Sequence, residues 1–369
     1  MNEGILVLNS GSSSLKFGVF TPRDGDEHAW LSGSAKGIGR DNGSWSIKSS
    51  DGQIDVAQDH VMESQHDALK RVADALAEHL DAPLVGVGHR VVHGGPRLRD
   101  HCRITDDVKH TLQDAVPFAP LHLPPALALI DEAQRIFADV PHFACFDTAF
   151  HRTLPERATR FALPREYAER GVVRYGFHGL SYESIVGELG ADLPARTVIA
   201  HLGSGASLCA LKDGRSVDTS MGMTPAGGIP MATRSGDLDP GVLIHLLRHA
   251  SLDADGIETL VNRRGGMKAL SESDDDMQGL LARRAQGDAD ASLAVDVFCT
   301  AVRKTIGAYA ALLGGVDLIV FSGGIGEHSD AVRSQVLEGL GFLGAAHRVV
   351  ATQEERQIAR HCRRLVGEE

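Results

Sequence analysis

The stretch ILVLNSGSSSLKFGVF, residues 5–20, places a cluster of small hydroxyl side chains between two apolar runs. The runs, residues 4–8 and 15–20, are rich in Val, Ile, Leu and Phe and predict two strands joined by a Gly/Ser turn. A turn of small residues lets backbone N–H groups point into a concavity where they bind anions, and Lys16 adds a positive charge. A single copy of this pattern is also typical of an ordinary hairpin.

The same pattern returns in the second half of the chain. VIAHLGSGASLCAL, within residues 197–222, matches LVLNSGSSSLKFGV as strand, polar residue, Gly-Ser turn, Ser-Leu and strand, with one residue inserted. The spacing is far too long for a solenoid repeat and predicts two domains of similar plan. Each domain would begin with a Gly/Ser hairpin, and two facing hairpins can hold a polyphosphate from both sides.

Composition excludes several classes of protein. The chain has 369 residues, 43% of them hydrophobic and 23% charged, which is typical of a globular protein of about two domains. Lys and Arg number 37 against 49 acidic residues, for a net charge of −12, so no nucleic-acid partner is expected. No apolar run reaches transmembrane length and no signal peptide precedes the first strand, so we expect a cytoplasmic protein without membrane contact. Five scattered cysteines fit a reducing compartment.

Strands alternate with helices along the rest of the chain, which indicates an α/β fold. The apolar spacing predicts a strand within 84–95, a helix over 123–140 and a strand over 142–151 that ends on Asp147. Asp239 followed by Pro240 is a helix-start signal. A third glycine-rich loop, SGGIGEH at 322–328, is expected between a strand and a helix.

Two arginines and two histidines stand out from the surface charges. Arg90 and Arg234 lie in Gly-flanked loops after apolar strands, and planar guanidinium groups suit carboxylate and phosphate. His178 and His201 have glycine and aromatic neighbours, although a lone histidine is more often structural. Asp147 follows a strand and could equally be a turn carboxylate. The zinc-protease motif HExxH and the hydrolase motif Gly-x-Ser-x-Gly are both absent from the sequence. The glycine-lined loops and the paired arginines instead favour phosphoryl transfer.

Taken together, nine motifs resemble the acetate kinase family of the acetate and sugar kinase/Hsp70/actin superfamily. They run in family order from residue 5 to 360: LVLNSGSSSLKF, GHRVVHGG, PLHLPP, FDTAFH, RYGFHGLSY, HLGSGASL, MATRSGDLDP, FSGGIGEH and ATQEERQIAR. The resemblance implies reversible transfer of the γ-phosphoryl of ATP to acetate, giving acetyl phosphate and ADP. It also implies two actin-like ATPase (ribonuclease H-like) lobes with a central cleft, and a homodimer.

The resemblance assigns roles to residues of this chain. The catalytic group would be Asp147, His178 and Arg234, and Mg²⁺, for which Mn²⁺ could substitute, would be held by Asn9 and Glu354. Arg90 would bind the carboxylate, with an apolar pocket for the acyl tail formed by Val92, Leu121, Phe177 and Pro225. ATP would be bound by Ser12, Ser14, Lys16, His201, Leu202, Gly203, Ser204, Gly205, Asp276, Met277, Gln278, Gly324, Ile325, Gly326, Glu327 and His328.

The same resemblance divides the chain into an N-terminal lobe over 1–147 and a nucleotide-binding lobe over 148–350. We expect the C-terminal helix, within 351–369, to rejoin the first lobe, because Glu354 would have to meet Asn9. An acetate carboxylate is already ionised at neutral pH, since a typical carboxyl pKa is about 4. Asp147 is therefore expected to orient an arginine or the metal ion rather than to accept a proton.

Departures from the family pattern fall around the nucleotide. The usual SSDMRD reads DDDMQG at 274–279, so Gln278 stands where the family has an arginine beside the base. Glu272 replaces a glycine, and Ser204 replaces an asparagine. Losing the stacking cation removes about 0.5–2 kcal/mol. The alternatives are therefore a propionate or other short-chain acyl kinase, a pyrophosphate-dependent variant, or a nucleotide-gated binding protein of the same fold.

Overall fold

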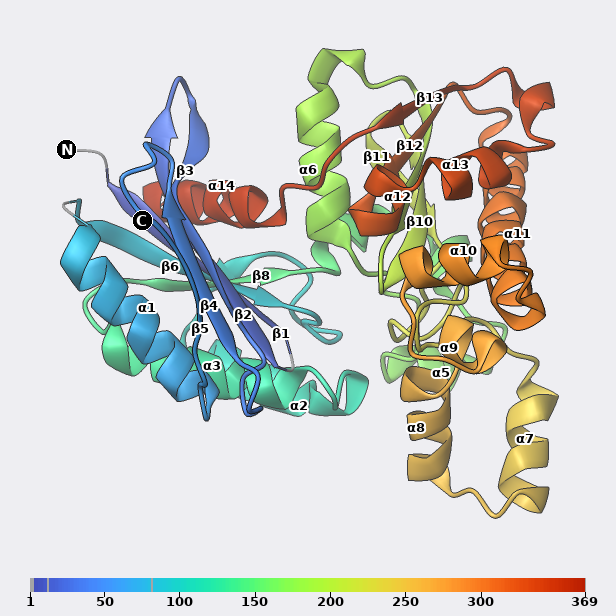
Figure 1. The fold of residues 1–369 in the computed structure, drawn as a ribbon, viewed down its shortest axis with the longest axis horizontal. Helices are drawn as coiled ribbons and strands as arrows, with labels where there is room; N and C mark the ends of the chain where they lie inside the picture. Colours follow the sequence, from blue (N-terminus) through green and yellow to red (C-terminus); the bar gives the residue numbers. More distant parts are fainter. Residues whose placement is uncertain (1–2, 12, 81, 369) are drawn as a thin grey trace. The chain divides into compact units, whose positions relative to one another are not determined.

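The computed structural model describes residues 3–11, 13–80 and 82–368, and Figure 1 shows the ribbon. The chain divides into two compact units. Unit 1 contains Met1–Ala149 together with Gln353–Glu369, and unit 2 contains Phe150–Thr352. Among the described residues, no helix has the length and apolar character needed to span a bilayer.

Unit 1 is built on a sheet of eight strands in the order β5-β4-β3-β2-β1-β6-β8-β7. Its strands are β1 (Gly4–Gly11), β2 (Ser14–Arg23), β3 (Asp26–Lys36), β4 (Ser44–Ser49), β5 (Asp55–Asp59), β6 (Leu84–Val91), β7 (Cys102–Arg103) and β8 (His142–Phe146). Its helices are α1 (Gln65–His79), α2 (Asp106–Asp114), α3 (Leu123–Ile136) and α14 (Glu354–Gly367).

Helices cover both faces of this sheet (Figure 1). Apolar residues of α1 and α3 join those of β1 to β4 in one buried cluster. On the other face α14 packs so closely on β6 that a Cβ atom at Gly88 would lie 2.6 Å from the Sγ of Cys362. Two ion pairs join the same helix to β3, one between Arg360 and Asp26 and one between Arg363 and Glu27. The last helix is therefore fixed to the first sheet.

Unit 2 repeats the plan around a five-stranded sheet in the order β11-β10-β9-β12-β13. Its strands are β9 (Arg196–Leu202), β10 (Ala206–Lys212), β11 (Arg215–Thr219), β12 (Leu318–Ser322) and β13 (Ala346–Val349). Its helices are α4 (Glu156–Thr159), α5 (Arg165–Glu169), α6 (Gly179–Leu189), α7 (Pro240–His249), α8 (Ala254–Arg263), α9 (Gly266–Ser271), α10 (Met277–Ala285), α11 (Ala289–Leu313), α12 (Gly323–His328) and α13 (Asp330–Leu337).

The sequence repeat is visible as one topology in both units. Each begins with an antiparallel hairpin, β1–β2 or β9–β10, whose first strand also pairs in parallel with a later strand, β6 or β12. In the ladders Asn9 lies opposite Lys16, and His201 lies opposite Ser207. The polar residue of each repeat therefore lies near the turn of its hairpin.

Several predicted boundaries differ from the structure. The helix expected over 123–140 ends at Ile136, because Phe137 leaves the helical region at φ −112° and ψ 50°. The strand expected to reach Asp147 ends one residue earlier, at Phe146. Residues 322–328 are not a loop before a helix, since α12 itself begins at Gly323. The helix start at Asp239 is confirmed, with the side chain accepting the N–H of Gly241.

Candidate functional site

Three polar side chains of unit 1 meet at one edge of its sheet. β1, β6 and β8 are neighbouring parallel strands, so their carboxyl ends lie at the same edge. Asn9 lies near the end of β1, Arg90 is the second-last residue of β6, and Asp147 directly follows β8. In open α/β sheets this edge is where ligands usually bind.

Arg90 is held by two partners. Its Nε and Nη2 donate to the two carboxylate oxygens of Asp147 over 2.9 and 2.6 Å, and its Nη1 donates to the Oδ1 of Asn9 over 3.2 Å. A guanidinium has five N–H donors, so one N–H on each Nη has no partner within the described residues. The arginine is therefore fixed in orientation and keeps donors for a ligand.

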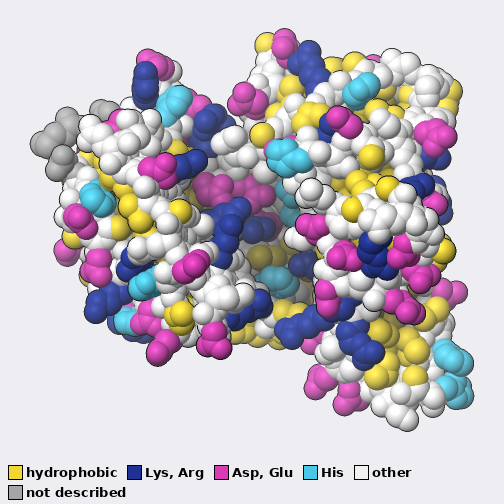
Figure 2. Space-filling view, in the orientation of Figure 1, with side chains coloured by type: hydrophobic (Ala, Val, Ile, Leu, Met, Phe, Trp, Pro, Cys, Tyr) yellow, Lys and Arg dark blue, Asp and Glu magenta, His cyan; other side chains and the backbone are white. Residues whose placement is uncertain are grey.

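Two acids from the start of α14 complete this group. Glu354 Oε2 lies 4.0 Å from Arg90 Nε, and Glu355 Oε1 accepts the Nδ2–H of Asn9 over 2.9 Å. Figure 2 shows acidic side chains gathered close to where α14 begins. The sequence reasoning missed Glu355, although its place beside Glu354 in QEER was a signal that both acids start the same helix.

The balance of charge in this group fits a cation. The carboxylates of Asp147, Glu354 and Glu355 face the cations Arg90 and Lys16. Burial raises the pKa of Glu354, and although Arg90 opposes this shift, the two other carboxylates reinforce it. For Arg90, burial lowers the pKa, but the carboxylates of Asp147 and Glu354 outweigh it and raise the pKa overall. A cation beside Glu354 would relieve its raised pKa, and amide and carboxylate oxygens are the ligands that Mg²⁺ prefers.

The other predicted residues of unit 1 that the structure describes lie on β2, after β6 and before α3. Lys16 is exposed on β2, and Ser14 is half-buried at the start of that strand, paired in the ladder with Gly11. Ser12 lies outside the described residues. Val92 follows β6 directly and Leu121 precedes α3, and both are half-buried.

In unit 2 the turn between β9 and β10 forms a second group. His201 lies near the end of β9, buried Leu202 ends the strand, and the turn residues 203–205 follow. A Cβ atom at Gly205 would lie 3.3 Å from Nε2 of His178 and 3.4 Å from Nη1 of Arg234. The backbone N–H of Ala232 donates to the carbonyl of Ser204, which ties the segment before Arg234 to the turn. The structure thus brings both predicted catalytic side chains of this unit to the glycine turn.

His178 has an unusual backbone conformation, and its side chain has hydroxyl neighbours that the sequence did not indicate. It precedes α6 with φ 57°, a left-handed conformation that strains a residue with a Cβ atom. Its Nδ1 lies 2.8 Å from the Oγ of Ser207, which in turn lies 2.5 Å from the hydroxyl of Tyr182. Its ring stacks on that of His201 with centroids 4.4 Å apart. The only signal for Ser207 was its place in the Ser-Leu step of the repeat.

The start of α12 lies against the same turn, because β12 runs parallel to β9 and Ser322 pairs with His201. A Cβ atom at Gly203 would lie 3.9 Å from the N of Gly324. The hydroxyl of Ser322 is fully buried and has no hydrogen-bond partner within the described part of the chain. Of the predicted nucleotide residues of α12, Gly324 and His328 are exposed, Ile325 and Glu327 are half-buried, and Gly326 is buried. The glycines therefore leave room beside a polar surface, as a bound phosphate requires.

The remaining predicted positions have structural surroundings of their own. Asp276 is the N-cap of α10 and accepts the N–H of Gly279 over 2.9 Å, while Met277 is buried and Gln278 is exposed. Phe177 is 1% exposed, and its carbonyl lies 2.9 Å from Nε2 of His151. Pro225 is buried, and its carbonyl accepts from Nη1 of Arg234.

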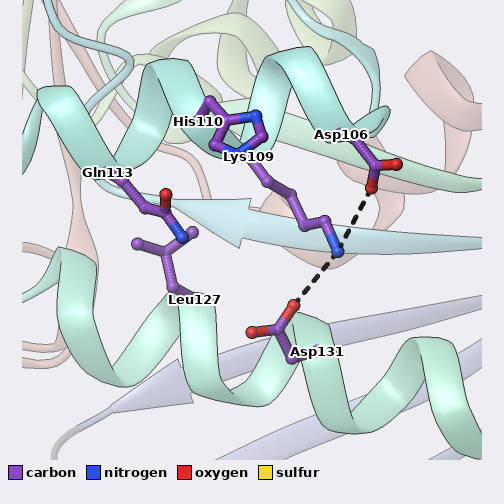
Figure 3. Close-up of a pocket in the computed structure, with 6 residues that line it drawn as sticks. All are labelled: Asp106, Lys109, His110, Gln113, Leu127 and Asp131. Carbon is purple, nitrogen blue, oxygen red and sulfur yellow. Dashed lines mark hydrogen bonds and ion pairs between the residues drawn. The ribbon is translucent and has the colours of Figure 1, made fainter.

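A pocket of about 200 Å³ lies elsewhere in unit 1, between α2 and α3 (Figure 3). Its lysine, Lys109, is paired with Asp131 at 3.3 Å and with Asp106 at 3.6 Å, so its charge is already neutralised. None of the predicted site residues lines it. It is therefore not the candidate site.

Known proteins resemble this chain in both sequence and fold. The sequence profile of the Acetokinase family matches residues 4–364. An acetate kinase of Clavibacter michiganensis subsp. michiganensis is 44% identical over 352 residues, covering 92% of this chain and 87% of the relative. The crystal structure of Porphyromonas gingivalis acetate kinase is similar with a TM-score of 0.87 and 31% identity, covering 99% of this chain and 100% of the other.

A propionate kinase from Francisella tularensis subsp. tularensis SCHU S4 is similar in structure with a TM-score of 0.92 and 32% identity. The match covers 98% of this chain and 100% of that one. These likenesses confirm the predicted α/β fold of the actin-like ATPase class.

Proposed function

This chain belongs to the Acetokinase family, whose members are ATP-dependent carboxylate kinases, and from this we propose how its residues work. The reaction is reversible transfer of the γ-phosphoryl group of ATP to acetate, which gives acetyl phosphate and ADP. The observation that best supports this proposal is the hydrogen bonding of the Arg90 guanidinium. Asp147 and Asn9 fix its orientation, and two of its N–H donors are left for an anion.

The carboxylate substrate binds to Arg90. A guanidinium with an N–H on each of two nitrogens matches the two oxygens of a carboxylate. Because acetate is ionised at neutral pH, its attack on the phosphorus needs no general base. Asp147 accepts two hydrogen bonds from Arg90 and thus acts by orienting that side chain. Val92 and Leu121 in unit 1, and Phe177 and Pro225 in unit 2, are the proposed contacts of the acyl tail.

The metal ion belongs to the acidic group of unit 1. Asn9 and Glu354 would hold Mg²⁺, because both offer oxygen atoms and Glu354 has a pKa raised by burial and by neighbouring carboxylates. The ion supplies neutralisation of the negative charge on the phosphoryl oxygens. Glu355 orients the amide of Asn9 by accepting its Nδ2–H.

The nucleotide phosphates bind to the glycine turn of unit 2. His178 and Arg234 both lie beside Gly205, where they can donate to the oxygens of the transferring phosphoryl group. A loose transition state spreads charge over three oxygens, so positioned donors are the main contribution of the protein. His201, residues 202–205 and residues 324–328 supply further contacts, and residues 276–278 are the proposed adenosine contacts.

The test is formation of acyl phosphate, trapped as the hydroxamate, from acids of two to four carbons with ATP, GTP and pyrophosphate as donors. We expect acetate with ATP to give the highest kcat/KM, and Arg90→Ala to raise the KM for acetate while leaving that for ATP nearly unchanged. Arg97→Ala is the matched control, because Arg97 pairs with Asp114 on the exposed surface. Hydrolysis of ATP without acyl phosphate would favour a nucleotide-gated binding protein instead.

Propionate is the second candidate substrate, because a propionate kinase is among the most similar solved structures. A higher kcat/KM for propionate than for acetate would support it. Pyrophosphate remains an alternative donor because Gln278 and Glu272 depart from the family pattern. ADP-dependent loss of acetyl phosphate would exclude that alternative.

We also propose that the chain forms a homodimer in a reducing cytoplasm. The five scattered cysteines of the sequence, with no CxxC pair, support the location. Val242, Ile244 and Leu247 of α7 are 43%, 47% and 46% exposed, and Figure 2 shows hydrophobic side chains gathered over α7 and α8. A second copy of the chain would cover this face. Light scattering should then give the mass of two chains, and Ile244→Glu should give the mass of one.

A further inference from the structure

We propose that Tyr182 and Ser207 form a hydrogen-bond chain that fixes the tautomer of His178 and holds its Nε2–H toward the glycine turn. The two hydroxyl residues would be positioning residues for phosphoryl transfer. This inference rests on the proposed function of His178. The three side chains lie within unit 2, on α6, on β10 and at the residue before α6.

Counting protons gives the direction of each hydrogen bond. Tyr182 and Ser207 are both 0% exposed, and Tyr182 has a pKa raised well above its usual value, because burial disfavours the phenolate. The phenol therefore carries its proton and must donate it. Within the described residues, its one hydrogen-bond partner is the Oγ of Ser207, 2.5 Å away.

The hydroxyl of Ser207 then has one proton of its own and two neighbours. Since Tyr182 donates to it, Ser207 directs its own proton to the Nδ1 of His178, 2.8 Å away. Nδ1 is thus an acceptor, and in the neutral ring the proton is on Nε2. The opposite arrangement would leave the buried phenol without an acceptor, which is unfavourable for a buried donor.

The orientation of the ring makes this proton useful. Nε2 is the atom of His178 that faces Gly205, where a Cβ atom would lie 3.3 Å from it. Arg234 approaches the same glycine through its Nη1. A donor preset toward the bound phosphoryl group requires no rearrangement during the reaction. With the other tautomer, a lone pair would face the phosphoryl oxygens and repel them.

The experiment combines a spectroscopic measurement without substrate and a kinetic one. In protein labelled with ¹⁵N-histidine, long-range ¹H–¹⁵N correlation spectra identify the tautomer of each ring, and His178→Gln assigns the signal. We expect the Nε2–H tautomer in the wild type at neutral pH. Ser207→Ala should give a tautomer mixture and lower kcat by about 10–100-fold, as loss of an orienting partner does for ligating histidines, with little change in the KM for ATP.

Two further variants keep the result decisive if Ser207→Ala does not fold. Tyr182→Phe removes only the hydroxyl that donates to Ser207, so it should shift the tautomer toward a mixture. It should also lower kcat about two- to tenfold, which corresponds to the loss of one hydrogen bond. Ser207→Thr restores a hydroxyl and should recover most of the activity. Tyr175→Phe is the matched control, because this buried phenol donates to the carbonyl of Gly171 instead, so kcat should not change.

The inference is wrong if wild-type His178 carries its proton on Nδ1, or if Tyr182→Phe leaves both the tautomer and kcat unchanged. The spectrum needs neither ATP nor acetate. A protein that shows the Nε2–H tautomer but forms no acyl phosphate would therefore contradict the proposed function, and not the role of Tyr182 and Ser207.

Discussion

Asp147→Asn removes the charge that holds Arg90 while nearly preserving the shape of the side chain. The asparagine amide can still accept one hydrogen bond, but its NH2 group cannot accept the second. Arg90 would then lose the bidentate contact made by its Nε and Nη2. We expect the variant to bind acetate with a poorly oriented guanidinium, and the unfolding free energy of unit 1 to fall.

The magnitude follows from the contacts. Hydrogen bonds to charged groups contribute about 1.5–3 kcal/mol each, and breaking a buried ion pair costs about 3–5 kcal/mol. The Arg90 side chain is 23% exposed and Glu354 lies 4.0 Å from it, so solvent and a second carboxylate offset part of the loss. We therefore expect a loss of about 2–3 kcal/mol. This corresponds to about a 30- to 150-fold lower kcat/KM for acetate and to a Tm lower by about 4–10 °C.

The assay measures acyl phosphate at saturating ATP over a range of acetate concentrations, and thermal unfolding of the same preparations. Asp114→Asn is the matched control, since Asp114 pairs with Arg97 where both side chains are more than half exposed. An exposed pair contributes about 0–1 kcal/mol, so this variant should keep both activity and Tm. Near-full turnover and an unchanged Tm in Asp147→Asn would refute the orienting role of the charge.

Three further predictions concern stability. Burial lowers the pKa of His89 to about 3, so below pH 6.5 the unfolded chain binds more protons than the folded one; the unfolding free energy should fall by about 2 kcal/mol from pH 6.5 to 5. Urea titrations measure this loss, and a pH-independent midpoint would contradict it. Gly88→Ala places a Cβ atom 2.6 Å from the Sγ of Cys362 in α14. We therefore expect the unfolding free energy measured in urea titrations to fall by about 1–3 kcal/mol, and Mg²⁺ activation to weaken. A variant as stable as the wild type would show that α14 can move. Glu272 has φ 50°, so Glu272→Gly should raise the unfolding free energy by about 0.5–1 kcal/mol, and a lowered Tm would show that its side chain makes a compensating contact.

The two hairpins were predictable because their signals are local. Alternating apolar strands and a Gly/Ser turn determine where each hairpin turns, and the ladder then places Asn9 opposite Lys16 and His201 opposite Ser207. The position of Arg90 at a strand end was predictable in the same way. Each of these depends on residues close together in the sequence.

The partners of these residues were not predictable, since they come from distant parts of the chain. Glu355 reaches Asn9 from 346 positions away, and Tyr182 reaches Ser207 from 25 positions away. Nothing in the spacing distinguishes a serine that points to a histidine from one that points to solvent. The helix start at Gly323 was missed for a different, local reason. Its N–H donates to the carboxylate of Glu327 inside the helix, and the residue before the helix, Ser322, makes no side-chain cap.

The difference between the two hairpins explains how one local pattern can support two kinds of binding. In unit 1 the hairpin lies beside a guanidinium and several carboxylates, where burial raises the pKa of Glu354 and the neighbouring carboxylates reinforce the shift. In unit 2 the same turn lies beside neutral hydroxyls, imidazoles and glycines, with Arg234 as the nearby cation. The first set suits a metal ion and a small carboxylate, and the second suits phosphate oxygens. Asn9→His or His201→Asn should therefore abolish activity while keeping the fold. The hairpin itself depends on its turn, whereas binding of each ligand depends on partners outside the hairpin.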